Sequence, residues 1–208
     1  MTQTEHARRR RTPTQDRARE TLDAVCAAAS AIIEEDGIQA LTTNAVARRA
    51  GVSITSVYAY FPDKWAIVHE LFERFERVRG DALADLTAEL ATTNDWRDVI
   101  DRIWDAMARF RVEVPAGMAL RHALHVSPRL AELDRAGSER SARALSDVML
   151  LRRPALDPGA AHRTAWAATI TAGMLLDDAV RDGVIDNTAL TEGKRIIKLT
   201  LARFLDDA

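Results

Sequence analysis

One side of a short segment, residues 54–60, carries hydroxyl, methyl and aromatic groups and few charges. If the segment is helical, Thr55, Ser56, Ala59 and Tyr60 share its outward face. Hydroxyl and methyl groups suit base edges and the thymine methyl, while tyrosine hydroxyls and the ammonium of Lys64 suit phosphate oxygens. The pattern therefore predicts a surface that contacts double-stranded DNA, with a helical hairpin that only packs a core as the alternative.

Two short helices joined by a tight turn are expected to position this face. Thr42 or Thr43 can N-cap a helix that ends at Ala50, and Gly51 can supply a left-handed turn residue. Ser53 can then cap a second helix that ends at residue 58 or 60.

The two helices must cross steeply, which requires a small residue at the crossing. Ala47 supplies it, and Val52 and Val57 supply apolar contacts beneath the second helix. The spacing of Ala47, Gly51 and Val57 is typical of a helix-turn-helix.

At these positions the sequence resembles the tetracycline-repressor (TetR) family of transcriptional regulators, over about residues 17–75. The matching residues are Thr42-Thr43, Val46-Ala47, Ala50-Gly51-Val52-Ser53, Val57-Tyr58, Tyr60-Phe61 and Lys64. The resemblance implies a homodimer with an N-terminal DNA-binding domain and a C-terminal domain for ligand binding and dimerisation.

The resemblance also implies which side chains meet DNA. Thr42 or Thr43, Tyr58, Tyr60 and Lys64 would contact the phosphate backbone, and residues 54–56 would enter the major groove. Thr55 replaces a glycine common in the family, and Trp65 replaces a common acidic residue. The full set expected at the DNA surface is Thr42, Thr43, Ser53, Thr55, Ser56, Tyr58, Tyr60, Lys64 and Arg8, Arg9, Arg10 and Arg11.

The N-terminal residues are basic. Residues 1–19 hold six Arg against Glu5 and Asp16, a net charge of +4, although the whole chain has a net charge of −2. The run Arg8–Arg11 resembles arms that enter a minor groove, whose negative potential attracts arginine. A solvated basic tail is the alternative.

Periodicity predicts an all-α fold. Apolar residues recur at helical spacing along the chain, and no stretch shows the alternation of a strand. After the hairpin, helices are expected from Pro62, from Trp96 to about Val114, through Leu130–Met149, and over 160–184 and 188–205. We expect a basic arm (1–16), a three-helix DNA-binding domain (17–64) and a larger helical regulatory and dimerisation domain (65–208).

Large polarisable side chains in the C-terminal half are candidates to line a ligand cavity, with core packing as the alternative. Arg121 and its neighbouring histidines are candidates to hold a carboxylate or phosphate. The candidate ligand residues are Trp104, Met107, Phe110, Met118, Arg121, His122, His125, Met149 and Trp166. His122 and His125 alone make no metal site, so no metal and no cofactor are predicted.

The last two helices are expected to form a homodimer interface. Small residues recur at helical spacing at Ala161, Ala165, Ala168, Ala172 and Gly173, and small residues permit close helix approach. The alternative is a contact within one protomer. The final helix adds an apolar face through Ile196, Ile197, Leu201, Phe204 and Leu205.

Together these features favour a repressor that a small-molecule ligand releases from a near-palindromic operator. A ligand-independent architectural DNA-binding protein remains open. A helical enzyme is disfavoured because no phosphate loop, metal cluster or nucleophile elbow is found, and Cys26 lies on an apolar helix face. With no membrane span and one cysteine, we expect a cytoplasmic protein.

Overall fold

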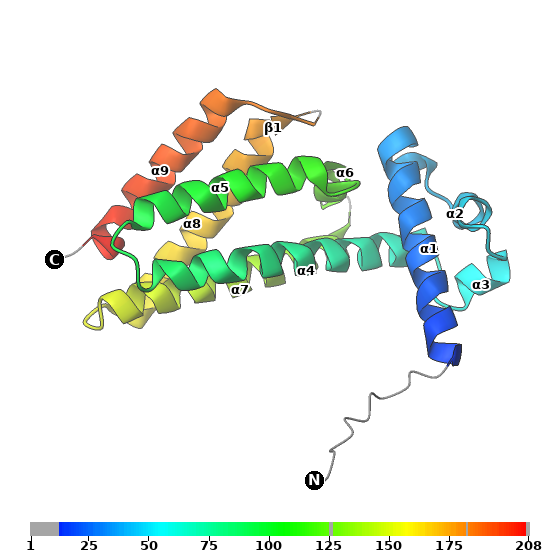
Figure 1. Ribbon diagram of the computed structural model, residues 1–208, viewed down its shortest axis with the longest axis horizontal. Coiled ribbons are helices and arrows are strands. Elements are labelled where there is room, and N and C mark those ends of the chain that lie inside the picture. The colour runs from blue at the N-terminus through cyan, green and yellow to red at the C-terminus, as the bar shows by residue number, and fades with distance from the viewer. Residues whose placement is uncertain (1–12, 125–126, 182, 207–208) are drawn as a thin grey trace, which may run out of the picture. The chain divides into compact units, whose positions relative to one another are not determined.

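The computed structural model describes residues 13–124, 127–181 and 183–206, and these residues are mainly helical (Figure 1). In chain order the elements are α1 (Pro13–Asp36), a 3₁₀ turn (Ile38–Ala40), α2 (Thr43–Ala50), α3 (Ile54–Tyr58), α4 (Lys64–Leu90), α5 (Trp96–Glu113), α6 (Gly117–Ala123), α7 (Pro128–Arg152), α8 (Pro158–Ala179), β1 (Val180–Arg181), β2 (Val184–Ile185) and α9 (Asn187–Leu205). The all-α fold class is confirmed.

Polar caps set the starts of the C-terminal helices. Asp95, Ser127, Asp157 and Asp186 each accept a hydrogen bond from a backbone N–H in the first turn of α5, α7, α8 and α9. Such caps satisfy amides that have no partner inside the helix.

The described residues divide into two compact units, one ending at Val68 and the other beginning at His69. In the first, α1 packs against α2, and α2 against α3. Its core is apolar and includes Val25, Cys26, Ala28, Ala29, Ile32, Ile33, Leu41, Val46, Ala47, Val57, Phe61, Ile67 and Val68.

In the second unit α8 packs against both α7 and α9, and α9 packs against α5. Helix α4 joins this bundle through the Phe75 ring, whose centroid lies 4.7 Å from that of Phe110 on α5. Trp96 and Trp104 of α5 are both fully buried. The backbone of α9 at Gly193 lies directly on the Trp104 ring, so any side chain there would collide with it.

The structure differs from the expected helices at two places. The helix expected over 160–184 ends at Ala179. It is followed by an antiparallel hairpin of two short strands, Val180–Arg181 and Val184–Ile185, with Gly183 (φ +73°) in the turn between them. Glycine adopts this backbone conformation without strain, which permits the turn. The short helix α6 was also not expected; Ala116, with φ +58°, turns the chain into it.

Candidate functional site

The turn between α2 and α3 has the helix-turn-helix geometry expected from the sequence. Thr42 caps α2 because its hydroxyl accepts a hydrogen bond from the Ala45 amide at 3.1 Å. Gly51 ends α2 in the left-handed conformation (φ 68°, ψ 25°). Ala47 is buried at the crossing, and its carbonyl accepts the Val52 amide at 3.1 Å.

Helix α3 shows its polar side to solvent. The Ser53 hydroxyl accepts a hydrogen bond from the Ser56 amide at 3.0 Å, while Val57 is fully buried beneath the helix. Thr55 is exposed and Ser56 half-buried. The Ser56 hydroxyl lies 2.8 Å from that of Ser53, so the backbone cap and the side-chain pair hold both hydroxyls in place.

Two tyrosines stand at the end of α3. The Tyr58 side chain is 53% exposed, and its hydroxyl lies 3.2 Å from the Thr43 hydroxyl on α2. This contact joins two residues that were both expected at the phosphate backbone. Tyr60 is 41% exposed, and the Lys64 ammonium lies 5.5 Å from the centre of the exposed Trp65 ring.

Sequence reasoning missed two arginines of α2. Arg49 forms two hydrogen bonds to the Glu35 carboxylate of α1, which lower the pKa of Glu35 and raise that of Arg49. Arg48 is exposed, and its charge would suit a phosphate. The two consecutive basic residues Arg48-Arg49 could have been noticed in the sequence as candidate phosphate contacts. Arg8–Arg11 lie outside the described residues.

The second unit contains a cavity of about 220 Å³ between its helices. Most of its wall is apolar, with charged and hydroxyl groups at some positions. The lining residues are Arg79, Leu83, Thr87, Leu90, Ile100, Ile103, Trp104, Met107, Arg111, Arg121, Asp134, Ser138, Ser141, Leu145, Ala168, Thr169, Ile170, Ala172, Gly173, Met174, Leu176, Ile197 and Leu201.

Three of the nine candidate ligand residues, Trp104, Met107 and Arg121, line this cavity. The structure places the others elsewhere because of their position on each helix. Phe110 packs on Phe75, Met149 is buried outside the cavity wall, Met118 is half-buried, His122 is exposed, and Trp166 lies under the guanidinium of Arg135 at 5.8 Å. His125 lies outside the described residues.

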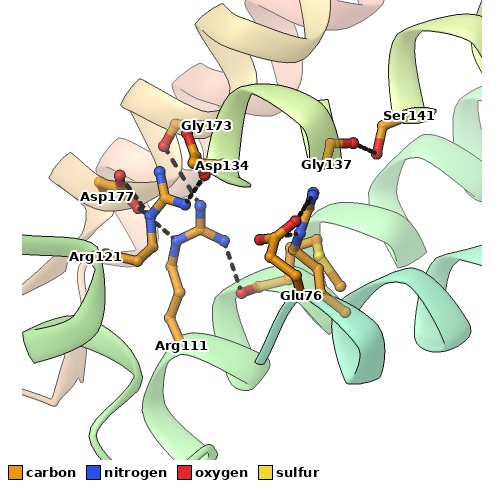
Figure 2. A network of polar contacts seen from close by, with 10 residues as sticks. Glu76, Arg111, Arg121, Asp134, Gly137, Ser141, Gly173 and Asp177 are labelled. Carbon is orange, nitrogen blue, oxygen red and sulfur yellow. Dashed lines mark hydrogen bonds and ion pairs between the residues drawn. The ribbon is translucent and has the colours of Figure 1, made fainter. Parts of the chain in front are cut away.

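A network of ion pairs borders the cavity (Figure 2). Asp177 of α8 accepts hydrogen bonds from Arg111 Nε at 2.7 Å and from Arg121 Nε at 2.8 Å. Arg121 Nη1 also donates to Asp134 of α7 at 2.9 Å. Arg111 donates further to the carbonyl of Met107, at 3.2 Å.

A second pair lies on α4, where Arg79 donates to both oxygens of the Glu76 carboxylate, at 3.0 and 2.6 Å. Glu76 is buried, and Gly137 of α7 lies directly on this pair. Figure 2 shows Glu76 between Arg111 and Gly137. The pair on α4 is thus packed directly against the backbone of α7.

Burial and pairing act against each other in this network. Burial lowers the pKa of Arg111 and outweighs the raising effect of Asp177. Burial also acts to lower the pKa of Arg121, but hydrogen bonds and charges from Asp177 and Asp134 outweigh it and the pKa is raised. Burial acts to raise the pKa of Asp177, and the two arginines lower it below its ordinary value.

Sequence reasoning missed Arg79, Arg111, Asp134 and Asp177. Arg111 and Asp177 are 66 residues apart, and Arg121 and Asp177 are 56 apart. No local pattern marks a pair formed at such separation, although Arg111 does stand on the apolar side of an amphipathic helix. A charged residue in that position could have indicated a buried ion pair.

The described residues contain neither a metal-binding cluster nor a membrane-spanning helix. Among residues 13–124, 127–181 and 183–206, no group of three or more His, Cys, Asp and Glu side chains is placed to hold a metal ion. In the same ranges no helix is long and apolar enough to cross a membrane.

A helix-turn-helix with an exposed second helix, in a chain that is otherwise helical, defines a class of DNA-binding proteins. A family model of bacterial regulatory proteins of the tetR family matches residues 25–71, and a model described as a tetracyclin repressor-like C-terminal domain matches residues 95–197. The chain belongs to the TetR family of transcriptional regulators. It is therefore a DNA-binding regulator and not an enzyme.

Solved structures agree with this assignment. A TetR-family transcriptional regulator from Streptomyces coelicolor is 28% identical, with a TM-score of 0.66 over 91% of this chain and 99% of that one. A TetR-family transcriptional regulator from Pectobacterium atrosepticum, 19% identical, has the same fold, with a TM-score of 0.65 over 95% of this chain and 99% of that one. A search of curated protein sequences found no match.

Proposed function

We propose that the protein is a repressor, and that it leaves a near-palindromic operator when a small molecule binds in the cavity of the second unit. The observation that supports this most directly is helix α4. It begins at Lys64, within the expected DNA-contact set, and further along the helix Arg79, Leu83 and Thr87 line the cavity. A ligand that contacts these residues acts on the helix that leads out of the DNA-binding unit.

We propose residues 17–64 as the DNA-binding domain and α3 as the element that enters the major groove. Thr55 and Ser56, from residues 54–56, would meet base edges. The contacts to the phosphate backbone would come from six residues, Thr42, Thr43, Ser53, Tyr58, Tyr60 and Lys64. Arg8–Arg11 would lie in the adjacent minor groove.

We propose residues 65–208 as the regulatory domain and a homodimer through α8 and α9. Met174 of α8 is 69% exposed and Leu199 of α9 is 65% exposed, with Ile196 beside it on α9. Exposed large apolar side chains on neighbouring helices are typical of an interface between proteins. A two-fold dimer would carry two recognition helices to two half-sites about one turn of DNA apart, about 34–36 Å.

Binding to duplex fragments from upstream of the protein's own gene, measured over a salt series, tests the DNA-binding part. Sequence-selective binding with a slope that indicates several neutralised phosphates is expected. Lys64→Met should lower the slope by about one, and Thr55→Ala should weaken selectivity and leave the slope unchanged. Equal affinity for all fragments would favour the architectural alternative instead.

Release by a ligand is tested separately. A compound that binds the cavity should lower operator affinity, and its effect should disappear when the cavity is filled by Leu145→Trp. Leu151→Trp, at an exposed position on α7 that does not line the cavity, is the matched control. Operator binding that no cavity ligand changes would contradict the release mechanism.

A further inference from the structure

The charges at the cavity are balanced. Arg79, Arg111 and Arg121 carry three positive charges, and their partners Glu76, Asp177 and Asp134 carry three negative charges. The side chains of Arg111 and Glu76 are almost wholly buried. A charged ligand placed here would add an uncompensated charge to a partly desolvated site, which is costly.

The same residues keep hydrogen-bonding capacity that the network does not use. Arg121 donates through Nε and Nη1, and Arg79 through Nε and Nη2. Within the described ranges, Arg121 Nη2, Arg79 Nη1 and the Ser138 hydroxyl have no hydrogen-bond partner, and all three residues line the cavity. Guanidinium nitrogens donate only, so they call for an acceptor oxygen on the ligand.

The rest of the wall is apolar. Leu83, Ile103, Trp104, Leu145 and Ile170 from four helices contribute to it, with smaller side chains between them. A volume of about 220 Å³ is small for a ligand site and restricts the occupant to a small molecule.

We propose that this cavity binds a small uncharged amphipathic molecule, with an apolar body against the apolar wall and a hydroxyl or carbonyl oxygen that accepts hydrogen bonds from Arg79, Arg121 and Ser138. This inference rests on the proposed function, in which the cavity is the ligand site. It goes further because it predicts that the cavity binds uncharged molecules more tightly than anions or cations. It also differs from the sequence-based expectation of a carboxylate or phosphate near Arg121.

Three probes of equal chain length that differ only in the head group test this inference: 1-octanol, octanoate and octylammonium. Their dissociation constants are measured by titration calorimetry at neutral pH. Octanol is expected to bind at least about tenfold more tightly than either ion, because only the ions add a charge to a balanced site. Leu145→Trp should abolish octanol binding, and Leu151→Trp should leave it unchanged.

A charge-changing variant sharpens the test. Asp134→Asn keeps the shape of the side chain but leaves the network with one excess positive charge. Octanoate should then bind at least as tightly as octanol, while octylammonium should remain weak. Because the comparison is between probes on one variant, a loss of overall stability does not obscure the result.

The inference is overturned if octanoate or octylammonium binds the wild-type protein as tightly as octanol, or if octanol binding is absent or survives Leu145→Trp. Operator affinity is measured in parallel so that the two proposals fail separately. Preferential octanol binding without release from DNA would contradict the release mechanism and leave the inference intact. If octanoate binds as tightly as octanol and also releases the protein from DNA, the inference is contradicted and the release mechanism is left intact.

Discussion

Gly137 shows how one residue connects the cavity network to the packing of two helices. It lies on α7 where the buried Glu76 carboxylate and Arg79 reach across from α4. A Cβ atom at Gly137 would overlap Glu76 Oε2 and lie 2.8 Å from Arg79 Nη2. Glu76 cannot easily move aside, because two hydrogen bonds to Arg79 hold it in a buried position.

Gly137→Ala should therefore destabilise the protein by about 1–3 kcal/mol, because overpacking outweighs the gain in helix propensity. Gly80→Ala on α4 is the matched control, since nothing lies within 4 Å of a Cβ at that position. That variant should be more stable than wild type by about 0.5–1 kcal/mol. Urea unfolding of both variants checks the prediction, and a stabilising effect at Gly137 would contradict it.

Asp177 links the stability of the second unit to pH. Its pKa in the folded protein lies below the ordinary value of 3.8, because Arg121 and Arg111 together outweigh the effect of burial. A carboxyl with a lowered pKa stabilises the fold fully above its unfolded pKa, and this contribution is lost as pH falls through the lower folded value.

Asp177→Asn should therefore remove part of the stability loss that the wild type shows as the pH falls below the ordinary value of 3.8 toward the lowered pKa of folded Asp177. At neutral pH the variant should be less stable by about 3–5 kcal/mol, because it leaves Arg111 buried without a charged partner. Free energies of unfolding measured across this pH range, for wild type and variant, check both effects. If the free energies of unfolding of the two proteins depend on pH in the same way, the prediction is contradicted.

At the scale of elements, the helix-turn-helix separates residues that hold the structure from residues that face outward. Ser53→Ala removes the cap of α3 and should cost about 0.5–2 kcal/mol of stability. Thr55 is exposed, so Thr55→Ala should change stability by less than about 0.5 kcal/mol. Its effect should appear in operator affinity instead, at about 1–3 kcal/mol per lost base contact. Thermal unfolding of both variants measures the effect of the cap, and DNA titration of Thr55→Ala measures the lost base contact.

The helix-turn-helix could be predicted because its signals are local. Thr42, Gly51 and Ser53 each act within three or four residues of their own position, as caps or as a left-handed turn. Helix α6 was missed because the left-handed residue that precedes it is Ala116, a residue type that gives no such signal. The end of α8 was misplaced because apolar residues continue through Val180 into the hairpin.

The cavity could be predicted only in part, because it depends on which side of each helix faces inward. Trp104 and Met107 are on the inward side of α5, while His122, chosen for its chemistry, is exposed. The ion pairs form between residues far apart in the chain, such as Arg121 and Asp177. Their pairing depends on the packing of α6 on the bundle, which the sequence does not display.

At the scale of the whole molecule, burial within one protomer decides which residues can form a dimer. Ala161, Ala165 and Ala168 are buried in the single chain, which is the intramolecular alternative that the sequence left open. Ala172 and Gly173 line the cavity. Three of the five small residues are thus packed within the protomer, and Ile196 and Leu199 on α9 mark an exposed apolar face that is left for a partner.

That face leads to a prediction about assembly and DNA binding together. Leu199→Lys places a charge on an exposed apolar position of α9 and should shift the dimer toward monomer, because burying an unpaired charge in an interface is costly. The matched control is Leu151→Lys, which adds the same charge at a position 66% exposed on α7. Sedimentation velocity over a range of concentrations measures both.

Loss of the dimer should also weaken operator binding, because each half-site would then be bound independently. Affinity for a full operator should fall toward the affinity for a single half-site, while the helix-turn-helix itself stays folded. Leu151→Lys should keep both the dimer and the full-site affinity. If the Leu199→Lys protein remains dimeric, the interface does not include this face of α9. If it is monomeric and still binds the full operator tightly, dimerisation does not set operator affinity.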